Sequence, residues 1–436
     1  MLAHHWTGAG QVEAAVSEWS RAGKYAEARG AFIEALESYQ QALTLLCAFP
    51  TTRDRDHREL ALCQSVVAML NVIKGYAAPE TINAVQRAIT LAEKNGDLNQ
   101  LVNLLTTQGG AFLVSGDFSN AAATFDRAQQ LAMKQRNPGN LAYVHGQQTM
   151  VHYWRGDLRV AEEHFQSWQE LFGHGETEGP VLGTSLNPAL NALAFGSYVA
   201  WISGRANVAR EREAELIALA NRGSLFEKAN AGYLTLALFL KEFRQAESLA
   251  ERTIQLAEKH HLPNPAARSR TVLGLALAHL GRAEEGVASS ERGITDLRKI
   301  GTRMGITQTM ARLAEAQGLA GRVREALESL EISLHILPDE VIFRPEILRL
   351  RGELRLKQQQ SEAAENDFRD SIAFAREMSA KGWELRSTTS LARLLSQTGH
   401  RDEARAMLAE IYNWFTEGFD TADLRDAQAL LDELSA

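Results

Sequence analysis

The 436-residue chain has little proline, little cysteine and no long hydrophobic run. Only 9 prolines occur, and this scarcity of a helix-breaking residue favours a chain that is mostly helical. The two cysteines, Cys47 and Cys63, form no C-x-x-C pair, so we expect two reduced, buried thiols. No apolar stretch approaches the roughly 20 residues of a membrane span, and no signal peptide opens the chain. We therefore expect a cytoplasmic protein with no membrane partner.

An excess of positive charge and the usual signatures of a reaction centre are also missing. The net charge is -8, whereas sequence-independent binding of nucleic acid needs clustered lysine and arginine, so we predict no nucleic-acid partner. His145 and His152 would lie about 10 Å apart on one helix, too far to share a metal ion. No nucleophile elbow or Cys/His signature occurs. We predict no metal, no cofactor and no enzymatic activity.

What the chain does have is an internal repeat. A small residue recurs at a period of about 40 residues, and a turn, usually with glycine, precedes it by five residues, as in Gly116-Asp117 and Gly321-Arg322. Such a period with a helix–turn–helix unit predicts an all-α, right-handed superhelical solenoid of long helical hairpins. The repeat marks are Ala121, Ala161, Ala209, Ala246, Gly286, Ala326, Ala364 and Ala404.

Individual units can be assigned helices. In one unit the pattern predicts a first helix over about 307–320 and a second over 324–336, which Pro338 ends. Small residues inside the first helices predict close contact between helices. The N-terminal stretch 24–46 fits two registers, between which the pattern does not choose: Gly23, Ala28, Phe32 and Ala35, or Gly30, Ala35, Tyr39 and Ala42.

The unit with Gly109, Gly116-Asp117-Phe118, Ala121, Phe125 and Ala128 resembles the tetratricopeptide repeat. The resemblance covers nearly the whole chain, with a period longer than the family's usual one. It implies that the first helices of the hairpins line a concave inner face.

The two ends of the chain resemble a more particular class. Residues 2–10 and the run 414–421 are similar to the ends of the C-terminal repeat region of bacterial adenylate or guanylate cyclases and transcriptional regulators that contain a signal-transduction ATPase. The phosphate-binding loop of that ATPase is missing, since Gly23-Lys24 is followed by Tyr25. We expect junction helices over 1–50, the repeat array over 51–415 and a capping helix over 416–436. The chain would then be the tail of a larger signalling protein, cut in nature or by design.

Aromatic and amide side chains of the first helices gather near one irregular step. The step from Ala161 to Ala209 is 48 residues long because of the loop 173–180, which is either a tolerated surface loop or a second place to look for function. Such side chains suit binding of a protein, peptide or small-molecule signal, and packing around the long step is the alternative interpretation. Arg268 and Arg270, then Arg344, Arg349 and Arg351, are further candidates for binding carboxylates, and scattered surface arginines are the interpretation that we favour over this role. The predicted binding residues are Tyr143, Met150, Tyr153, Trp154, Asn191, Tyr198, Trp201, Phe239 and Arg268.

These observations favour a non-catalytic sensory module. The resemblance implies that its bound signal regulates an ATPase or cyclase head. A stand-alone scaffold that bridges proteins and a sensor for a small-molecule inducer are the two alternatives.

Overall fold

The structure is a computed structural model, and it describes residues 2–172 and 187–436. The loop 173–180 lies outside the described residues. Within them the chain forms helices and no strands, and none of these helices has the length and hydrophobicity needed to cross a membrane. The helices are α1 (Leu2–Gly8), α2 (Val12–Ala28), α3 (Phe32–Leu46), α4 (Arg53–Ile73), α5 (Pro79–Asn95), α6 (Leu98–Ser115), α7 (Phe118–Gln135), α8 (Pro138–Trp154), α9 (Leu158–Phe172), α10 (Pro188–Ile202), α11 (Ala206–Arg222), α12 (Leu225–Tyr233), α13 (Phe243–Lys259), α14 (Pro263–His279), α15 (Ala283–Lys299), α16 (Ile306–Leu319), α17 (Val323–Ile336), α18 (Arg344–Lys357), α19 (Ser361–Glu377), α20 (Lys381–Gln397), α21 (Arg401–Tyr412) and α22 (Ala422–Ser435).

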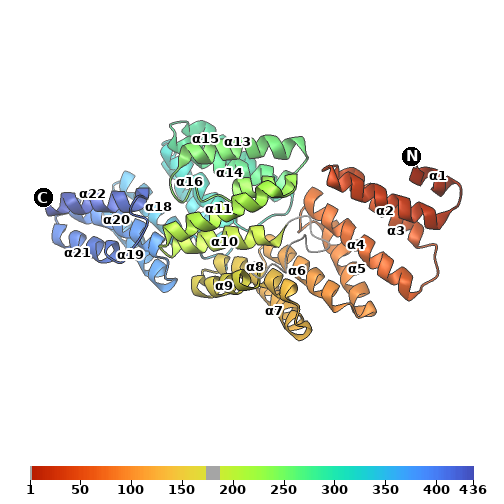
Figure 1. Ribbon diagram of the computed structural model, residues 1–436. Coiled ribbons are helices and arrows are strands. Elements are labelled where there is room, and N and C mark those ends of the chain that lie inside the picture. The colour runs from red at the N-terminus through yellow and green to blue at the C-terminus, as the bar shows by residue number, and fades with distance from the viewer. Residues whose placement is uncertain (1, 173–186) are drawn as a thin grey trace.

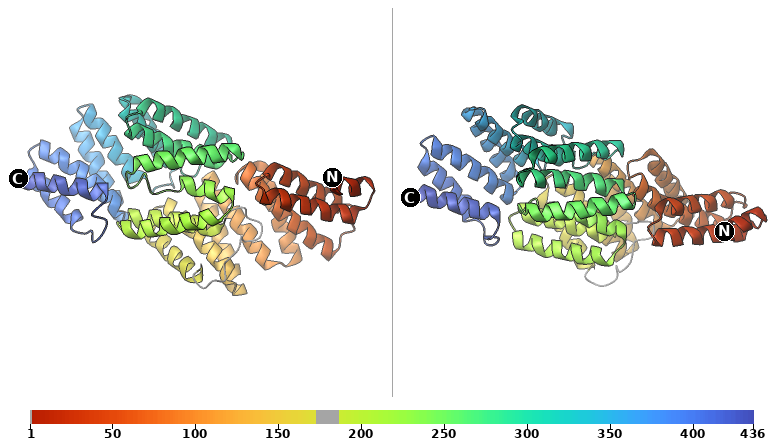
Figure 2. Two further views of the ribbon diagram at one scale, coloured as in Figure 1. Left: turned by 45° about the horizontal axis from the view of Figure 1, so that its top comes forward. Right: turned by 90° about the horizontal axis from the view of Figure 1, so that it is seen from above.

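Consecutive helices pack in pairs, from α2 with α3 to α20 with α21. From α6 onward, the first helix of each pair also contacts the first helix of the next, so that these helices form a continuous inner row that ends at α22. The pairs wind from the N-terminal end of the molecule to its C-terminal end (Figures 1 and 2). The predicted all-α solenoid is therefore confirmed.

The turns inside the pairs have a left-handed residue at a fixed place. Gly116 has φ 85°, and the side chain of Asp117 then caps α7 by accepting a hydrogen bond from the Asn120 N–H at 3.1 Å. Two units without glycine still adopt this conformation, at Lys241 (φ 61°) and Gln359 (φ 64°). The backbone path of the turn is therefore kept even where its preferred residue is absent.

Aromatic rings of the second helices pack against small residues of the first helices. A Cβ atom on Gly109 would lie 2.4 Å from Cε1 of Phe125, and one on Gly352 would lie 2.5 Å from Cε1 of Phe368. Both phenylalanines are fully buried. The close contact predicted at small residues is thus a ring packed directly on the glycine backbone.

The N-terminal helices settle the choice between the two registers. The chain breaks after α2, and α3 places Tyr39 directly against Gly23, so the register with Gly30, Ala35 and Tyr39 is correct. The expected pair of buried thiols is half wrong, because Cys63 is buried but Cys47, which follows the last residue of α3, is exposed.

Segments far apart in sequence meet where one turn of the superhelix touches the next. The N–H groups of Arg303 and Met304 donate to the carbonyl of Val114, at 2.8 and 3.0 Å. Likewise, Val341 donates to the carbonyl of Trp154 at 3.1 Å. The ends of α6 and α8 are thus hydrogen-bonded to the segments before α16 and α18. We call these bonds the inter-turn contacts.

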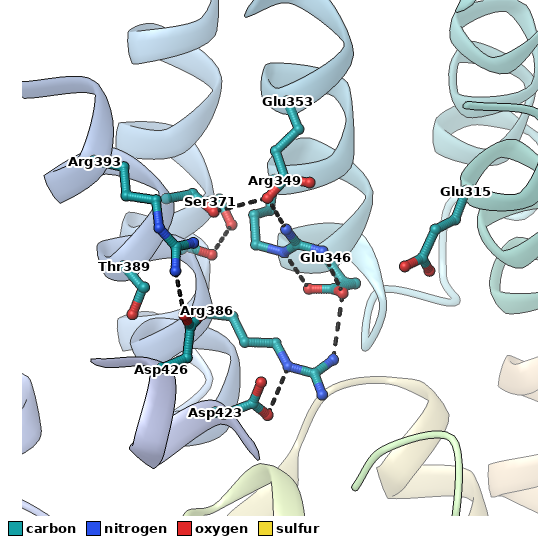
Figure 3. A network of polar contacts seen from close by, with 12 residues as sticks. Glu315, Glu346, Arg349, Glu353, Ser371, Arg386, Thr389, Arg393, Asp423 and Asp426 are labelled. Carbon is teal, nitrogen blue, oxygen red and sulfur yellow. Dashed lines mark hydrogen bonds and ion pairs between the residues drawn. The ribbon is translucent and has the colours of Figure 1, made fainter. Parts of the chain in front are cut away.

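An ionic network joins the C-terminal helices (Figure 3). Arg349 of α18 pairs with Glu346 at 2.8 Å, and Arg386 of α20 pairs with Asp423 of α22 at 2.9 Å. Arg349 and Arg351 are thus neither binding sites for external carboxylates nor scattered surface arginines, because internal acids hold both: Arg351 pairs with Asp367 at 2.7 Å. Arg344 lies over the ring of Phe374 instead.

Candidate functional site

A cavity of about 120 Å³ lies inside the superhelix, on the inner row of helices. Helices α4, α6, α8, α10, α12, α14 and α16 each contribute to its wall, and most contribute residues four apart, which lie on one helix face. A cavity of similar size, about 150 Å³, is known to hold a benzene-sized ligand. The six residue pairs at this spacing within one helix are Thr106 and Gly110, Tyr143 and Gln147, Asn191 and Phe195, Phe226 and Asn230, Arg268 and Val272, and Gln308 and Arg312.

The structure brings six of the nine predicted binding residues together at this cavity. They come from three first helices that neighbour one another in the inner row, α8 and α10 followed by α14 beyond α12. These residues are Tyr143, Met150, Trp154, Asn191, Tyr198 and Arg268.

The other three predicted residues do not line the cavity. Tyr153 is fully buried against Phe195, with ring centroids 5.2 Å apart. Trp201 and Phe239 pack on each other at 5.0 Å and on Trp383 of α20. For these three residues the alternative interpretation, packing, describes their placement.

Several wall residues were missed by the sequence analysis, among them Asn71, Gln308 and Arg312. They lie on α4 and α16, far in sequence from the irregular step on which the prediction concentrated. A usable signal was present only at Asn71, which is the one polar residue in the otherwise apolar stretch 66–73 of α4. Polar groups on an inner helix face that do not pack as core often mark a binding surface.

The charge in the wall comes from two arginines. Arg268 is 9% exposed and donates from Nη2 to the carbonyl of Met304 at 3.1 Å. Arg312 is partly exposed, and desolvation inside the cavity lowers its pKa to about 10. Both side chains therefore carry a positive charge at neutral pH.

Tyrosines and one buried acid complete the electrostatics. Burial raises the pKa of Tyr143 to about 12, so its phenol stays neutral and can donate a hydrogen bond. Glu340 lies behind the wall, where it accepts from the N–H of Gly305 at 2.8 Å and of Thr307 at 3.2 Å. Burial raises the pKa of Glu340 to about 7 in spite of these bonds. The wall is thus neutral apart from its arginines.

Three wall residues, Val114, Trp154 and Met304, also take part in the inter-turn contacts. Trp154 lines the cavity, while its carbonyl accepts the bond from Val341. Met304 lines the cavity, accepts from Arg268, and donates its own N–H to Val114. Residues of the cavity wall therefore form the hydrogen bonds that hold the turns of the superhelix together.

A third histidine joins the two that the sequence singled out, outside the cavity. His164 of α9 lies with its Nδ1 2.9 Å from Nδ1 of His145, and its ring stacks on His152 at 5.4 Å. Burial and its two neighbours lower the pKa of His164 to about 4. Over residues 2–172 and 187–436, no group of three or more His, Cys, Asp or Glu residues has the geometry of a metal site.

No family model matches the chain. An uncharacterised protein of Rhizobium meliloti (strain 1021) is 21% identical over 412 residues, which are 90% of this chain and 39% of that protein. This chain thus spans well under half the length of that relative.

A solved structure is similar in fold to this chain. A Rap protein complexed with Competence and Sporulation Factor has a TM-score of 0.57 at 13% identity, over 85% of this chain and 99% of that one. The apo form of RapI has a TM-score of 0.47 at 15% identity, over 65% of this chain and 98% of that one. The first likeness shows the tetratricopeptide-like helical-repeat fold.

Proposed function

We propose that this chain is a non-catalytic sensory module that binds a small molecule in the cavity of its superhelix. The observation that carries the proposal is the cavity itself, in which aromatic rings, amides and two arginines from seven first helices converge. The wall combines aromatic and apolar side chains with amides, hydroxyls and arginines, and polar groups that converge in a partly apolar pocket are typical of small-molecule sites. The wall has no nucleophile beside a general base, so its groups are suited to binding rather than to bond breaking.

The bound signal would act through the inter-turn contacts. A ligand that moves Arg268 would shift Met304, which Arg268 contacts and which bonds to Val114. A ligand that moves Trp154 would shift the carbonyl that accepts the bond from Val341. Either shift would favour one spacing of the superhelical turns over another. The partner that senses this change is proposed to be an ATPase or cyclase head. Its support is the sequence resemblance of the two ends, together with the greater length of the Rhizobium relative.

A peptide or protein partner is the second candidate. The Rap protein of similar fold was solved in complex with Competence and Sporulation Factor. A space of about 120 Å³ is too small for an extended peptide of several residues. A peptide would therefore have to separate the turns, whereas a small molecule fits between them as they stand.

A substitution that fills the cavity tests the proposal. Gly110 lies in the wall on α6, and a Cβ atom there would meet nothing within 4 Å. Gly110→Leu should therefore fold, gain helix propensity and occupy the ligand space. The matched control is Gly8→Leu, at the end of α1, where a Cβ atom also meets nothing within 4 Å.

The measurement is native mass spectrometry after incubation with a metabolite extract from bacterial cells. We expect a bound small molecule on the wild type and on Gly8→Leu, and none on Gly110→Leu. A ligand present at 100 times its Kd should also stabilise the wild type by about 2.7 kcal/mol. Equal binding to Gly110→Leu, or no bound molecule on any of the three proteins, would overturn the proposal.

A further inference from the structure

Two arginines in the cavity wall have no acidic partner. Across residues 2–172 and 187–436, Arg312 forms no hydrogen bond or ion pair. Arg268 donates only to the carbonyl of Met304 and lies 5.7 Å from the centroid of the Tyr233 ring. Both guanidinium groups have thus lost much of their hydration without gaining a carboxylate.

Other arginines of this chain with little exposed side chain are paired. Arg212 contacts Glu162 at 2.6 Å, and Arg349 contacts Glu346 at 2.8 Å (Figure 3). Proteins rarely leave a buried charge without a partner, because its desolvation is costly. The two arginines of the cavity are therefore an exception that packing does not explain.

The two acids that interact electrostatically with these arginines form their hydrogen bonds elsewhere. Glu340 holds the N–H groups of Gly305 and Thr307 at the start of α16. Glu315 accepts from Nε2 of His279 at 2.8 Å. Each acts on one of the arginines only from a distance, and neither acid contacts either guanidinium group.

We propose that the cavity binds a small organic acid whose carboxylate lies between Arg268 and Arg312. The inference rests on the function proposed above and names the chemistry of its ligand. A guanidinium presents parallel N–H donors that match the two oxygens of a carboxylate. The rest of the ligand is an aromatic or apolar body that packs on rings such as Trp154 and Tyr198, and the volume limits it to about one ring system.

Matched acids and amides test this assignment. Thermal unfolding and titration calorimetry are carried out with benzoate, phenylacetate and indole-3-acetate, and with benzamide, phenylacetamide and indole-3-acetamide. The variants are Arg312→Met and Arg268→Met, and the control is Arg324→Met, an arginine whose side chain is 88% exposed. Arg312→Met breaks no hydrogen bond, so it carries the test if Arg268→Met does not fold.

We expect at least one acid to raise the unfolding temperature of the wild type while its amide does not. Arg312→Met should weaken that acid at least tenfold, and Arg324→Met should leave it unchanged. Amides that bind as well as the acids, with no effect of Arg312→Met, would overturn the carboxylate assignment and leave the cavity as a ligand site. Failure of all three acids to bind the wild type, or a neutral ligand recovered from the metabolite extract, would also overturn it.

Discussion

The main-chain carbonyl of Trp154 accepts a hydrogen bond from the N–H of Val341 at 3.1 Å, across two turns of the superhelix. The indole of the same tryptophan lines the cavity. One residue thus belongs to the candidate binding site and to the contact that sets the spacing of the turns. This double role is the physical basis for a sensor in this fold, because a ligand can bias only those contacts that it touches or moves.

The contact beside Trp154 can be tested through Gly156. This glycine has φ 76°, and an added Cβ atom would lie 2.5 Å from Sδ of Met378 and 2.9 Å from Cγ2 of Val341. Gly156→Ala should lower the free energy of unfolding by about 2 kcal/mol, from backbone strain and from separation of the turns. The control is Gly399→Ala, with φ 89° and nothing within 4 Å, which should cost about 1 kcal/mol by strain alone. Equal losses in urea denaturation would mean that the turns are not held there.

Gln359 should be replaceable by glycine with a gain in stability. Its φ of 64° is unfavourable for a side chain, and the residue is exposed. Gln359→Gly should raise the free energy of unfolding by about 1 kcal/mol, measured in urea. Gln358→Gly, at φ -95°, should instead lower it, because glycine there only adds flexibility to the unfolded chain. A loss in Gln359→Gly would contradict the strain assigned to this turn.

Arg312 should reduce the stability of the ligand-free protein. Arg312→Met removes an unpaired charge from the cavity wall, so we expect the free energy of unfolding to rise by about 1 kcal/mol. Arg349→Met, which removes a paired arginine of comparable burial, should lower it by about 3 kcal/mol. Calorimetric unfolding of the two variants provides the measurement. A loss in both would show that Arg312 has a structural partner.

Glu340 should make stability depend on pH. Its carboxyl has a pKa of about 7 in the folded protein, against an ordinary value of 4.5. The folded state thus binds the proton more tightly than the unfolded state. The stabilisation is complete below about pH 4.5 and is lost as the pH rises through 7. Urea denaturation between pH 5 and 8 should show wild type losing stability relative to Glu340→Gln; a constant difference would contradict the burial assigned to this acid.

The repeat and its local packing could be predicted from the sequence because they depend on neighbours. The helix predicted over 307–320 is α16, and the small residues Gly109 and Gly352 pack as expected, since each contact lies within one hairpin. The choice between the two registers of 24–46 required Tyr39 to be seen against Gly23. Pattern alone allowed both.

The closure of the turns could not be predicted in the same way. Val114 and Met304 meet only because small rotations add up over the intervening hairpins. Trp383 of a later turn covers Trp201 and Phe239, which therefore pack rather than line the cavity. Arg312 was missed because a single arginine in a helix resembles a solvated residue until its surroundings are known.

Hydrogen–deuterium exchange at the amides of Met304 and Val341 tests the central claim most directly. Both amides belong to the inter-turn contacts, and each donates a hydrogen bond to the carbonyl of a residue of the cavity wall, Val114 or Trp154. The wild type and Gly110→Leu are compared with and without the ligand recovered from the metabolite extract. The account predicts that the ligand changes exchange at both amides in the wild type and at neither in Gly110→Leu. Ligand bound to the wild type with unchanged exchange at both amides would contradict it.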